Sequence, residues 1–360
     1  MALTAAALLP WTVATQGQDT EITKEHPRVK KVISVQEELT PGLMAQPEIL
    51  GTAVGQDDDG EITLVVFVNT EISNHGEVVR ALPRSFNGVR VSAQLTDRFR
   101  ALGKPSGGGA KVSHKAKQTP PIQLGTSGGW GNDLANGYCC GGTLGSLIKV
   151  GTVQYILSNY HVFESDIVPG GNGRVAATGD SIIQPGLIDV NCTAGNAQSV
   201  ATLFQVSSLP NNNVDCSVAQ VISGMVSTTG TILEIGTISA TTVTAAVNQA
   251  VKKSGRTSGL TRSKVIGLNA TISVAYENEC AGGAAFTKTF TGQIVISNRG
   301  SSFLTGGDSG SLMVQDVTTN PMAVGLLYAG SSTSAIANPI DEVLAFLGPK
   351  LGGAATMVGN

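Results

Sequence analysis

Short runs of strand-forming residues, separated by turn formers, fill residues 122–351 and constrain the fold more than any other feature of the chain. Such runs between clusters of glycine, asparagine, serine and aspartate are typical of a β-sandwich or of β-barrels. This part of the sequence therefore predicts a mainly β fold. The runs lie at residues 155–157, 218–222, 232–238, 265–268, 271–275, 293–296, 312–314 and 324–327.

One helix is predicted near the end of the chain. Asn338 suits its N-cap and Pro339 its first helical position. An apolar stripe over residues 343–347 gives the helix a face to bury, and Gly348 followed by Pro349 predicts its end.

The loop Gly55-Gln-Asp-Asp-Asp-Gly60 favours a hairpin turn over a calcium loop, because it lacks the D-x-[DN]-x-[DN]-G spacing and the distal glutamate of a calcium loop. It belongs to a segment that predicts a small α+β unit. The elements expected there are a helix over 32–39 that Pro41 ends, strands over 49–54 and 62–68, a short helix over 77–82 and a strand over 89–95.

Composition divides the chain into parts. Residues 101–120 are rich in glycine, then basic, then end in proline, and they carry no apolar period, so they predict a flexible linker. The predicted parts are a leader or signal segment (1–25), the small α+β domain (26–100), the linker (101–120), the main β domain (121–351) and a tail (352–360).

The first residues, MALTAAALLPWTV, are similar to the apolar stretch of a signal peptide, but no lysine or arginine precedes them. The sequence therefore leaves a secreted or periplasmic protein and a cytoplasmic one open, and it favours the first. No uncharged apolar run of about 18 residues is present, so no membrane-spanning helix is predicted.

Charge and cysteine usage exclude further classes of protein. A formal net charge of −3 gives no electrostatic footprint for a nucleic-acid partner. The sequence contains no C-x-x-C spacing, which would indicate a structural zinc site, and it implies no metal and no cofactor. At most two disulfides are possible, with no pairing indicated, and buried thiols are the alternative. The cysteines are Cys139, Cys140, Cys192, Cys216 and Cys280.

His161 is the one histidine of four that lies within the predicted β domain. It follows an apolar strand, in Ser158-Asn-Tyr-His-Val. A single histidine in a β protein is more often structural than catalytic. A catalytic role therefore needs a second observation.

That observation is the segment Gly307-Asp308-Ser309-Gly310. All four are turn formers, so a plain β-turn is the simplest interpretation. A serine between glycines on a tight turn also exposes its hydroxyl, and the amides of Gly307 and Ser309 can converge on one point. Such an amide pair stabilises the oxyanion of a tetrahedral intermediate.

A serine nucleophile needs a base and a carboxylate that orients the base. His161 is the candidate base, and Asp215 is the favoured acid because it lies where a polar turn enters an apolar strand. A carboxylate buried there needs a partner. The order His161, Asp215, Ser309 occurs in one type of serine protease triad. The other candidate acids are Asp166, Asp180 and Asp189.

Further segments match a family pattern in the expected order across residues 121–347: CGGTLG (140–145), SNYHV (158–162), IQPG (183–186), KSGRTSGLT (253–261), GDSGSL (307–312), VGLLYAG (324–330) and ANPI (337–340). The chain thus resembles the chymotrypsin-fold, trypsin-like serine peptidases. It is more closely similar to bacterial trypsin-like proteins related to the catalytic domain of the plant narrow-leaf protein. Residues 26–100 resemble the small domain that often precedes this peptidase domain.

The resemblance implies two packed antiparallel β-barrels, chymotrypsin-like, with the active site in the cleft between them. It implies that Ser309 is the nucleophile, that His161 is the base oriented by Asp215, and that the amides of Gly307 and Ser309 form the oxyanion hole.

Alignment with the family assigns substrate binding to Tyr328, Ala329 and Gly330, and it places Phe303 near the floor of the specificity pocket. No acidic residue lies around Phe303. The resemblance therefore implies a preference for an apolar or small side chain rather than for lysine or arginine.

The chain also departs from the family. No cysteine follows His161, so the usual disulfide to Cys140 is not expected. Digestive members pair the acid before the serine, here Asp308, with a freed N-terminus, whereas this chain has a long extension upstream. Arg256 is interpreted as a brace of the second barrel, and direct contact with substrate is left open.

The sequence favours a serine endopeptidase that hydrolyses peptide bonds through an acyl-enzyme, with a protein or peptide as its substrate. The alternatives are a weak or inactive peptidase-fold protein that binds partners as a scaffold, and a general esterase. Residues 26–100 are interpreted as a pro-segment acting in cis, an intramolecular chaperone or a recruiting module. The oligomeric state is left open.

Overall fold

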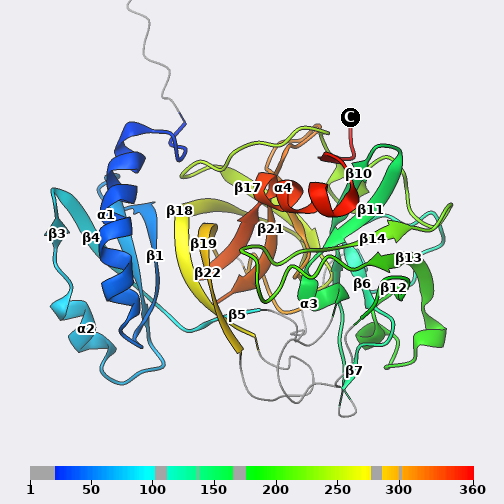
Figure 1. Cartoon of the computed structure of the whole chain (residues 1–360), viewed down its shortest axis with the longest axis horizontal. Coiled ribbons are helices and arrows are strands. Elements are labelled where there is room, and N and C mark those ends of the chain that lie inside the picture. Colours follow the sequence, from blue (N-terminus) through cyan, green and yellow to red (C-terminus); the bar gives the residue numbers. More distant parts are fainter. Residues whose placement is uncertain (1–20, 102–111, 136–137, 165–175, 277–285, 300–301) are drawn as a thin grey trace, which may run out of the picture.

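The structure is a computed structural model that describes residues 21–101, 112–135, 138–164, 176–276, 286–299 and 302–360. Strands predominate, in two large sheets with few helices (Figure 1). The predicted mainly β class is therefore confirmed, together with the C-terminal helix and the preceding α+β unit. Most of the predicted leader (1–25) lies outside the described residues.

The first barrel is a closed ring of antiparallel strands. Its strands are β6 (Thr126–Trp130), β9 (Gly142–Leu144), β10 (Ser146–Val150), β11 (Val153–Ser158), β12 (Ser181–Gln184), β13 (Gln198–Phe204) and β14 (Ser217–Val221). Pairing runs from β10 through β11, β14, β13, β12 and β6 to β9. Because β9 and β10 follow each other across Gly145, the ring closes through the chain. β23 (Ala355–Met357) pairs with β10.

The second barrel closes through pairing alone. Its strands are β17 (Ala250–Gly255), β18 (Gly259–Tyr276), β19 (Phe286–Ser297), β20 (Leu312–Gln315), β21 (Ala323–Gly330) and β22 (Ser334–Pro339). Each pairs antiparallel with the next in the order β17, β20, β21, β22, β19, β18, and β18 pairs with β17.

The N-terminal unit extends the sheet of the second barrel rather than forming a separate sheet (Figure 1). β1 pairs antiparallel with β18, with Gly51 opposite Ile272. From there the sheet continues through β2, β4 and β3. The elements are α1 (Pro27–Met44), β1 (Ile49–Gln56), β2 (Ile62–Asn69), α2 (His75–Ala81), β3 (Ser85–Phe86), β4 (Val89–Thr96) and β5 (Phe99–Ala101).

The remaining elements are short, apart from the C-terminal helix. They are β7 (Leu134–Ala135), β8 (Tyr138–Cys139), α3 (Tyr160–Phe163), the 3-10 turns η1 (Leu187–Asp189) and η2 (Ala194–Asn196), β15 (Thr231–Ile232), β16 (Gly236–Thr237) and α4 (Ile340–Leu351).

Separate apolar clusters form the cores. One lies inside the first barrel, around Trp130 and Ile156, and another inside the second, around Phe303 and Leu327. A third cluster joins the N-terminal unit to the second barrel, with Phe67 and Phe99 packed among residues that include Tyr328. Burial of apolar surface therefore fixes the N-terminal unit against the second barrel.

Several boundaries differ from those predicted. Pro41 lies inside α1, which runs on to Met44, and Pro349 lies inside α4, which runs to Leu351 and has Gly352 as its C-cap with a φ of 80°. A proline near a helix end removes one amide donor, but the helix continues past it. The N-cap of α4 is Pro339 rather than Asn338, whose side chain is used elsewhere.

Two predictions about strands and loops were partly wrong. The predicted strand over 232–238 is a tight hairpin of β15 and β16, and the predicted strands at 265–268 and 271–275 form one long strand, β18. The acidic loop after β1 is a hairpin turn as predicted, because Gln56 pairs with Ile62 and Asp57 accepts the amides of Asp59 and Glu61.

The domain boundaries stay a prediction. Residues 102–111 of the predicted linker lie outside the described residues, but its later part is anchored. His114 is buried, and its ring nitrogens lie 2.7 Å from the carbonyl of Gly125 and 2.7 Å from the carboxylate of Glu234.

One disulfide, Cys139–Cys192, is present among the described residues. Cys216 is a free, buried cysteine. Burial raises the pKa of its thiol well above the usual value, as is typical of a structural rather than a reactive cysteine.

Gly51 is predicted to be essential for the joined sheet. A side chain there would overlap the backbone of Thr271 on β18. Overpacking of this kind costs about 1–3 kcal/mol, so Gly51→Ala should lower the free energy of unfolding, measured by denaturant titration. Gly42→Ala is the matched control, because nothing lies near its Cβ and alanine favours the helix by about 0.5–1 kcal/mol. Equal stability of the two variants would contradict the account.

Candidate active site

Asp215 is fully buried at the entrance to β14, and three donors converge on its carboxylate. Oδ1 accepts the backbone amide of Tyr160 at 2.8 Å. Oδ2 lies 2.7 Å from Nδ1 of His161 and accepts the hydroxyl of Tyr276 at 2.9 Å. Because a carboxylate only accepts, Nδ1 of His161 carries a proton, and Nε2 is the ring nitrogen left to take one up.

The backbone at Asp215 is held as firmly as its side chain. Its amide donates to Oδ1 of Asn338 at 2.9 Å, and its carbonyl accepts from Nδ2 of Asn159 at 2.8 Å. Asn338 also donates to Gln293, so it crosses from the second barrel to the loop that carries Asp215. This contact explains why Asn338 does not cap α4.

His161 lies in α3 at the end of β11 and is 5% exposed. Its ring packs edge-on against Tyr276, with centroids 6.1 Å apart. Tyr276 in turn packs against Phe290, and Phe290 packs against Tyr328. The hydroxyl of Ser309 donates to the carbonyl of Tyr328 at 3.4 Å. A continuous row of rings thus connects His161 with the strand that contacts Ser309.

The segments that carry His161 and Ser309 meet at Gly142. A Cβ on Gly142 would lie 2.6 Å from the side chain of Val162 and 3.1 Å from the carbonyl of Ser309. The next amide, that of Thr143, donates to that same carbonyl at 2.9 Å. Glycine at position 142 therefore permits the close approach of the two segments, which the two barrels contribute.

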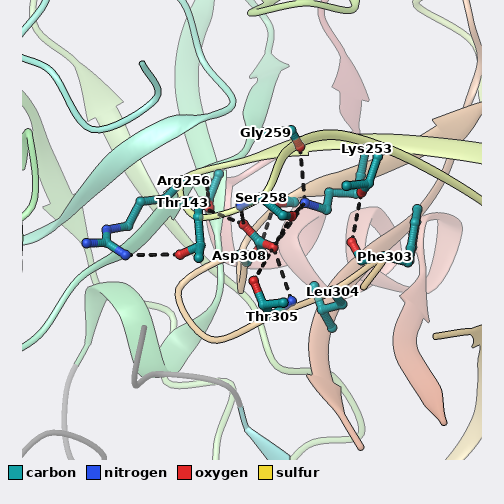
Figure 2. Close-up of polar contacts among 12 residues, drawn as sticks. Thr143, Lys253, Arg256, Ser258, Gly259, Phe303, Leu304, Thr305 and Asp308 are labelled. Atoms are coloured by element: carbon teal, nitrogen blue, oxygen red, sulfur yellow. Dashed lines mark hydrogen bonds and ion pairs between the residues drawn. The ribbon is translucent and has the colours of Figure 1, made fainter. Parts of the chain in front are cut away.

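Asp308, the residue before Ser309, is buried and paired with a buried lysine (Figure 2). Nζ of Lys253 on β17 lies 3.0 Å from Oδ2 of Asp308. The same oxygen accepts from the hydroxyl of Ser258 and from the amide of Thr305, and Oδ1 accepts the amides of Thr257 and Ser258. These contacts tie the loop before Ser309 to the β17–β18 turn.

The pKa values of both groups of this ion pair are shifted from their usual values. Burial alone would raise the pKa of Asp308, but the charge of Lys253 and the hydrogen bonds from Ser258 hold that pKa below its usual value. Burial lowers the pKa of Lys253, and Asp308 opposes that shift. The charged form of Asp308 is thus favoured only while Lys253 and the neighbouring donors remain in place.

The peptide planes of the loop are also fixed. The carbonyl of Gly306 accepts from the Thr257 hydroxyl at 2.6 Å, and that of Gly307 accepts from the Thr143 hydroxyl at 2.9 Å. In a trans peptide the amide points opposite to the carbonyl before it, so the Gly307 amide faces away from Thr257. Gly307 has a φ of 89°, and a Cβ there would lie 2.6 Å from Thr257 Oγ1. Glycine is therefore required at this position.

Arg256 braces the barrels. Its guanidinium makes a bidentate pair with Asp189 of η1, with Nε and Nη2 at 2.6 and 2.5 Å. Its backbone amide donates to Thr143, which also holds Gly307. Arg256 thus links the second barrel to the first, whereas the sequence predicted a brace of the second barrel, and a direct contact with substrate stays a prediction.

The other candidate acids have separate partners. Asp189 binds Arg256 and Ser127, and Asp180 accepts the Trp130 indole N–H at 3.0 Å. Asp166 lies outside the described residues. Asp215 is thus the described candidate that meets His161.

The residues predicted to bind the substrate do not all lie in one apolar cluster of the structure. Tyr328 and Ala329 belong to the apolar cluster that also holds Tyr276. Phe303 is buried in a different cluster, the core of the second barrel. Its place at the floor of a specificity pocket stays a prediction.

Sequence reasoning missed two residues of the site, Lys253 and Tyr276. Lys253 lies in a segment matched to the family pattern, but a lysine on a strand gives no sign of burial by itself. The signal for it was Asp308, because a buried carboxylate needs a cation or hydrogen-bond donors close by. Nothing in the sequence around Tyr276 indicates its contact with Asp215.

Neither metal ligands nor membrane-spanning helices are seen in the described part of the chain. No group of three or more histidine, cysteine, aspartate or glutamate side chains there is arranged to hold a metal ion. No described helix is long and apolar enough to cross a membrane.

Comparison with known proteins gives one family match. The family described as the Nal1 C-terminal domain matches residues 209–338, which include Asp215 and Ser309 but not His161. This segment is less than half of the chain. No curated protein sequence matches.

Among solved structures the chain is similar to serine proteases of the chymotrypsin fold. A glutamic-acid-specific serine protease and protease A of Thermobifida fusca each give a TM-score of 0.42 at 17% identity. Each match covers 66% of this chain and 100% or 99% of the other. Chymotrypsin of Cellulomonas bogoriensis gives 0.40 at 17% identity, over 66% of this chain and 99% of that one.

Lys253→Met leaves Asp308 buried without its cation. Removing one partner of a buried ion pair costs about 3–5 kcal/mol, so the free energy of unfolding at neutral pH should fall by roughly that amount in a denaturant titration. Lys252→Met is the matched control, since the adjacent Lys252 donates to the carbonyl of Val317. Its loss should be about 1–2 kcal/mol. A loss for Lys253→Met no larger than that of the control would contradict the role given to the pair.

Proposed function

We propose that the chain is a serine-type endopeptidase that hydrolyses peptide bonds through an acyl-enzyme. In this proposal Ser309 is the nucleophile, His161 the general base, and Asp215 the acid that orients His161. The observation that carries the proposal is the buried contact between Nδ1 of His161 and Oδ2 of Asp215 at 2.7 Å. It fixes the imidazole tautomer that leaves Nε2 to handle the proton.

The proposed reaction moves one proton through Nε2. Ser309 Oγ attacks the carbonyl carbon of the substrate while its proton passes to His161, and the positive imidazolium is stabilised by Asp215. The carbonyl oxygen becomes an oxyanion that the amides of Gly307 and Ser309 stabilise. His161 then gives its proton to the leaving amine, which departs as the carbon–nitrogen bond breaks. A water molecule hydrolyses the acyl-enzyme by the same steps and restores Ser309.

Lys253 supports this proposal by supplying the charge that Asp308 needs. In a buried loop a carboxylate is stable only with a cation and hydrogen-bond donors close by. Because Lys253 is an internal residue, the loop that presents Gly307 and Ser309 does not depend on a new N-terminus. Tyr328, Ala329 and Gly330 are proposed to bind the substrate, and Phe303, in the separate core cluster of the second barrel, is proposed to lie near the floor of the specificity pocket. The similarity to the plant narrow-leaf protein is part of the same proposal.

Labelling with a fluorophosphonate tests the nucleophile. The reagent should modify Ser309 of the full chain, and labelling followed to completion should disappear in Ser309→Ala and in His161→Ala. The matched control is His75→Ala, because His75 contacts only the carbonyl of Ile72 in the N-terminal unit among its described partners. Labelling that persists in His161→Ala, or that never reaches Ser309, favours the scaffold alternative.

Tyr276→Phe tests the third donor on Asp215. The change removes the hydroxyl at 2.9 Å and keeps the ring packed against His161. A hydrogen bond to a charged group contributes about 1.5–3 kcal/mol, so the rate of Ser309 labelling should fall by about tenfold or more. Tyr155→Phe, in the first barrel against Phe204, should label at the parent rate. An unchanged labelling rate in Tyr276→Phe would exclude this role.

A further inference from the structure

β5 lies along the strand that contacts the proposed nucleophile. It pairs antiparallel with β21, with Arg100 opposite Gly330 and Ala101 opposite Ala329. The next residue of β21 in this direction is Tyr328, whose carbonyl accepts the Ser309 hydroxyl. β5 therefore runs toward Ser309, and its last residue, Ala101, lies one register position away from Tyr328.

This position is the available edge of β21. On one side, Ala329 and Gly330 pair with β22. On the other side, β20 pairs with β21 only at Ala323, Gly325 and Leu326. Beyond that point β5 takes the place of β20. An extended peptide that binds a sheet edge forms the same main-chain pairing, so such a peptide and β5 compete for one edge.

Side chains before β5 extend the contact along the β21–β22 turn. The Thr96 hydroxyl donates to Ser331 at 2.7 Å, and the carboxylate of Asp97 accepts from the amide of Ser332 at 2.8 Å. Gln94 donates to the hydroxyl of Ser334 at 2.9 Å. Residues 94, 96, 97, 100 and 101 thus contact or pair with residues between 329 and 334.

The two ends of β5 differ in their surroundings. Phe99 is fully buried and packs edge-on against Phe67 at 5.5 Å, within the cluster that holds Tyr276 and Tyr328. Ala101 is 9% exposed, where little room is left for a larger side chain. Arg100, between them, reaches out to Glu71 at 3.0 Å. The edge thus accepts an aromatic side chain, then a tolerant position, then a small side chain.

We propose that β5 occupies in cis the edge of β21 at Ala329 and Gly330, two residues already proposed to bind the substrate, and that this edge accepts an extended peptide with an aromatic residue two positions before a small one. The proposal rests on the proposed function in so far as the peptide is a substrate. It names the partner as an extended peptide and gives the N-terminal unit a role. A substrate can pair with β21 only when β5 has dissociated from this edge. The complete burial of Ser309 in this conformation agrees with an occupied site.

Competition between β5 and a peptide in trans tests the proposal. All chains carry Ser309→Ala, so binding is measured without catalysis, by fluorescence anisotropy of a labelled peptide with the sequence of residues 96–101, Thr-Asp-Arg-Phe-Arg-Ala. Phe99→Ala weakens β5 and raises the fraction of chains with an open edge. Because the apparent Kd equals the intrinsic Kd divided by that fraction, the peptide should bind about tenfold more tightly than to the parent.

Phe86→Ala is the matched control, since Phe86 packs against the helix side of the N-terminal unit and away from β21. Its affinity for the peptide should stay at the parent value. A peptide with alanine in place of phenylalanine should bind the Phe99→Ala chain about tenfold more weakly than the original peptide. Equal affinity of the parent and the Phe99→Ala chain, or of the two peptides, overturns the proposal.

Arg100→Pro covers the case in which Phe99→Ala disturbs the fold. It removes one amide donor of β5 and leaves Phe99 in the core. Tighter peptide binding by this variant supports the proposal, and unchanged binding overturns it. Because these chains lack Ser309, peptide binding is independent of the nucleophile. Peptide binding here together with no fluorophosphonate labelling of the chain that keeps Ser309 would refute the peptidase and leave the cis-occupied site standing.

Discussion

Two fully buried carboxylates, Asp215 and Asp308, impose the constraint on which the site depends. A buried charge is stable only when donors or a cation surround it. At Asp215 these donors include the His161 ring, so satisfying the acid also sets the histidine tautomer. At Asp308 they include Lys253 and the β17–β18 turn, so satisfying that acid also shapes the loop before Ser309. One physical requirement thus positions groups from both barrels.

The continuous sheet gives the N-terminal unit a structural reason to influence the site. β18 pairs with β1 on its outer edge and carries Tyr276, which contacts Asp215, near its end. The same strand also pairs with β5. Residues that were interpreted as a separate module therefore share main-chain pairing and an apolar cluster with the second barrel. In our proposal this arrangement lets the N-terminal unit occupy the peptide edge that it lies beside.

The sequence allowed the β class, most strands and the terminal helix to be predicted, because alternation and turn residues act locally. It also indicated His161, Asp215 and Ser309, since few histidines and one Gly-Asp-Ser-Gly segment narrowed the choice. Lys253 and Tyr276 were not predictable, because their roles arise from contacts between strands far apart in the chain. The pairing of β1 with β18 escaped prediction for the same reason. The helix boundaries predicted from Pro41 and Pro349 were wrong, because a proline near a helix end removes only one amide donor.

The central claim is that Asp215 orients His161 so that Ser309 can be acylated. The most direct test is to mix the full chain with p-nitrophenyl acetate at mildly acidic pH and to map the acetyl group by peptide mass spectrometry. We expect acetylation of Ser309 in the parent chain and its loss in Asp215→Asn, which offers the histidine the wrong tautomer. Acetylation of Ser309 that is undiminished in Asp215→Asn, or acetylation confined to other residues of the parent chain, would contradict the account.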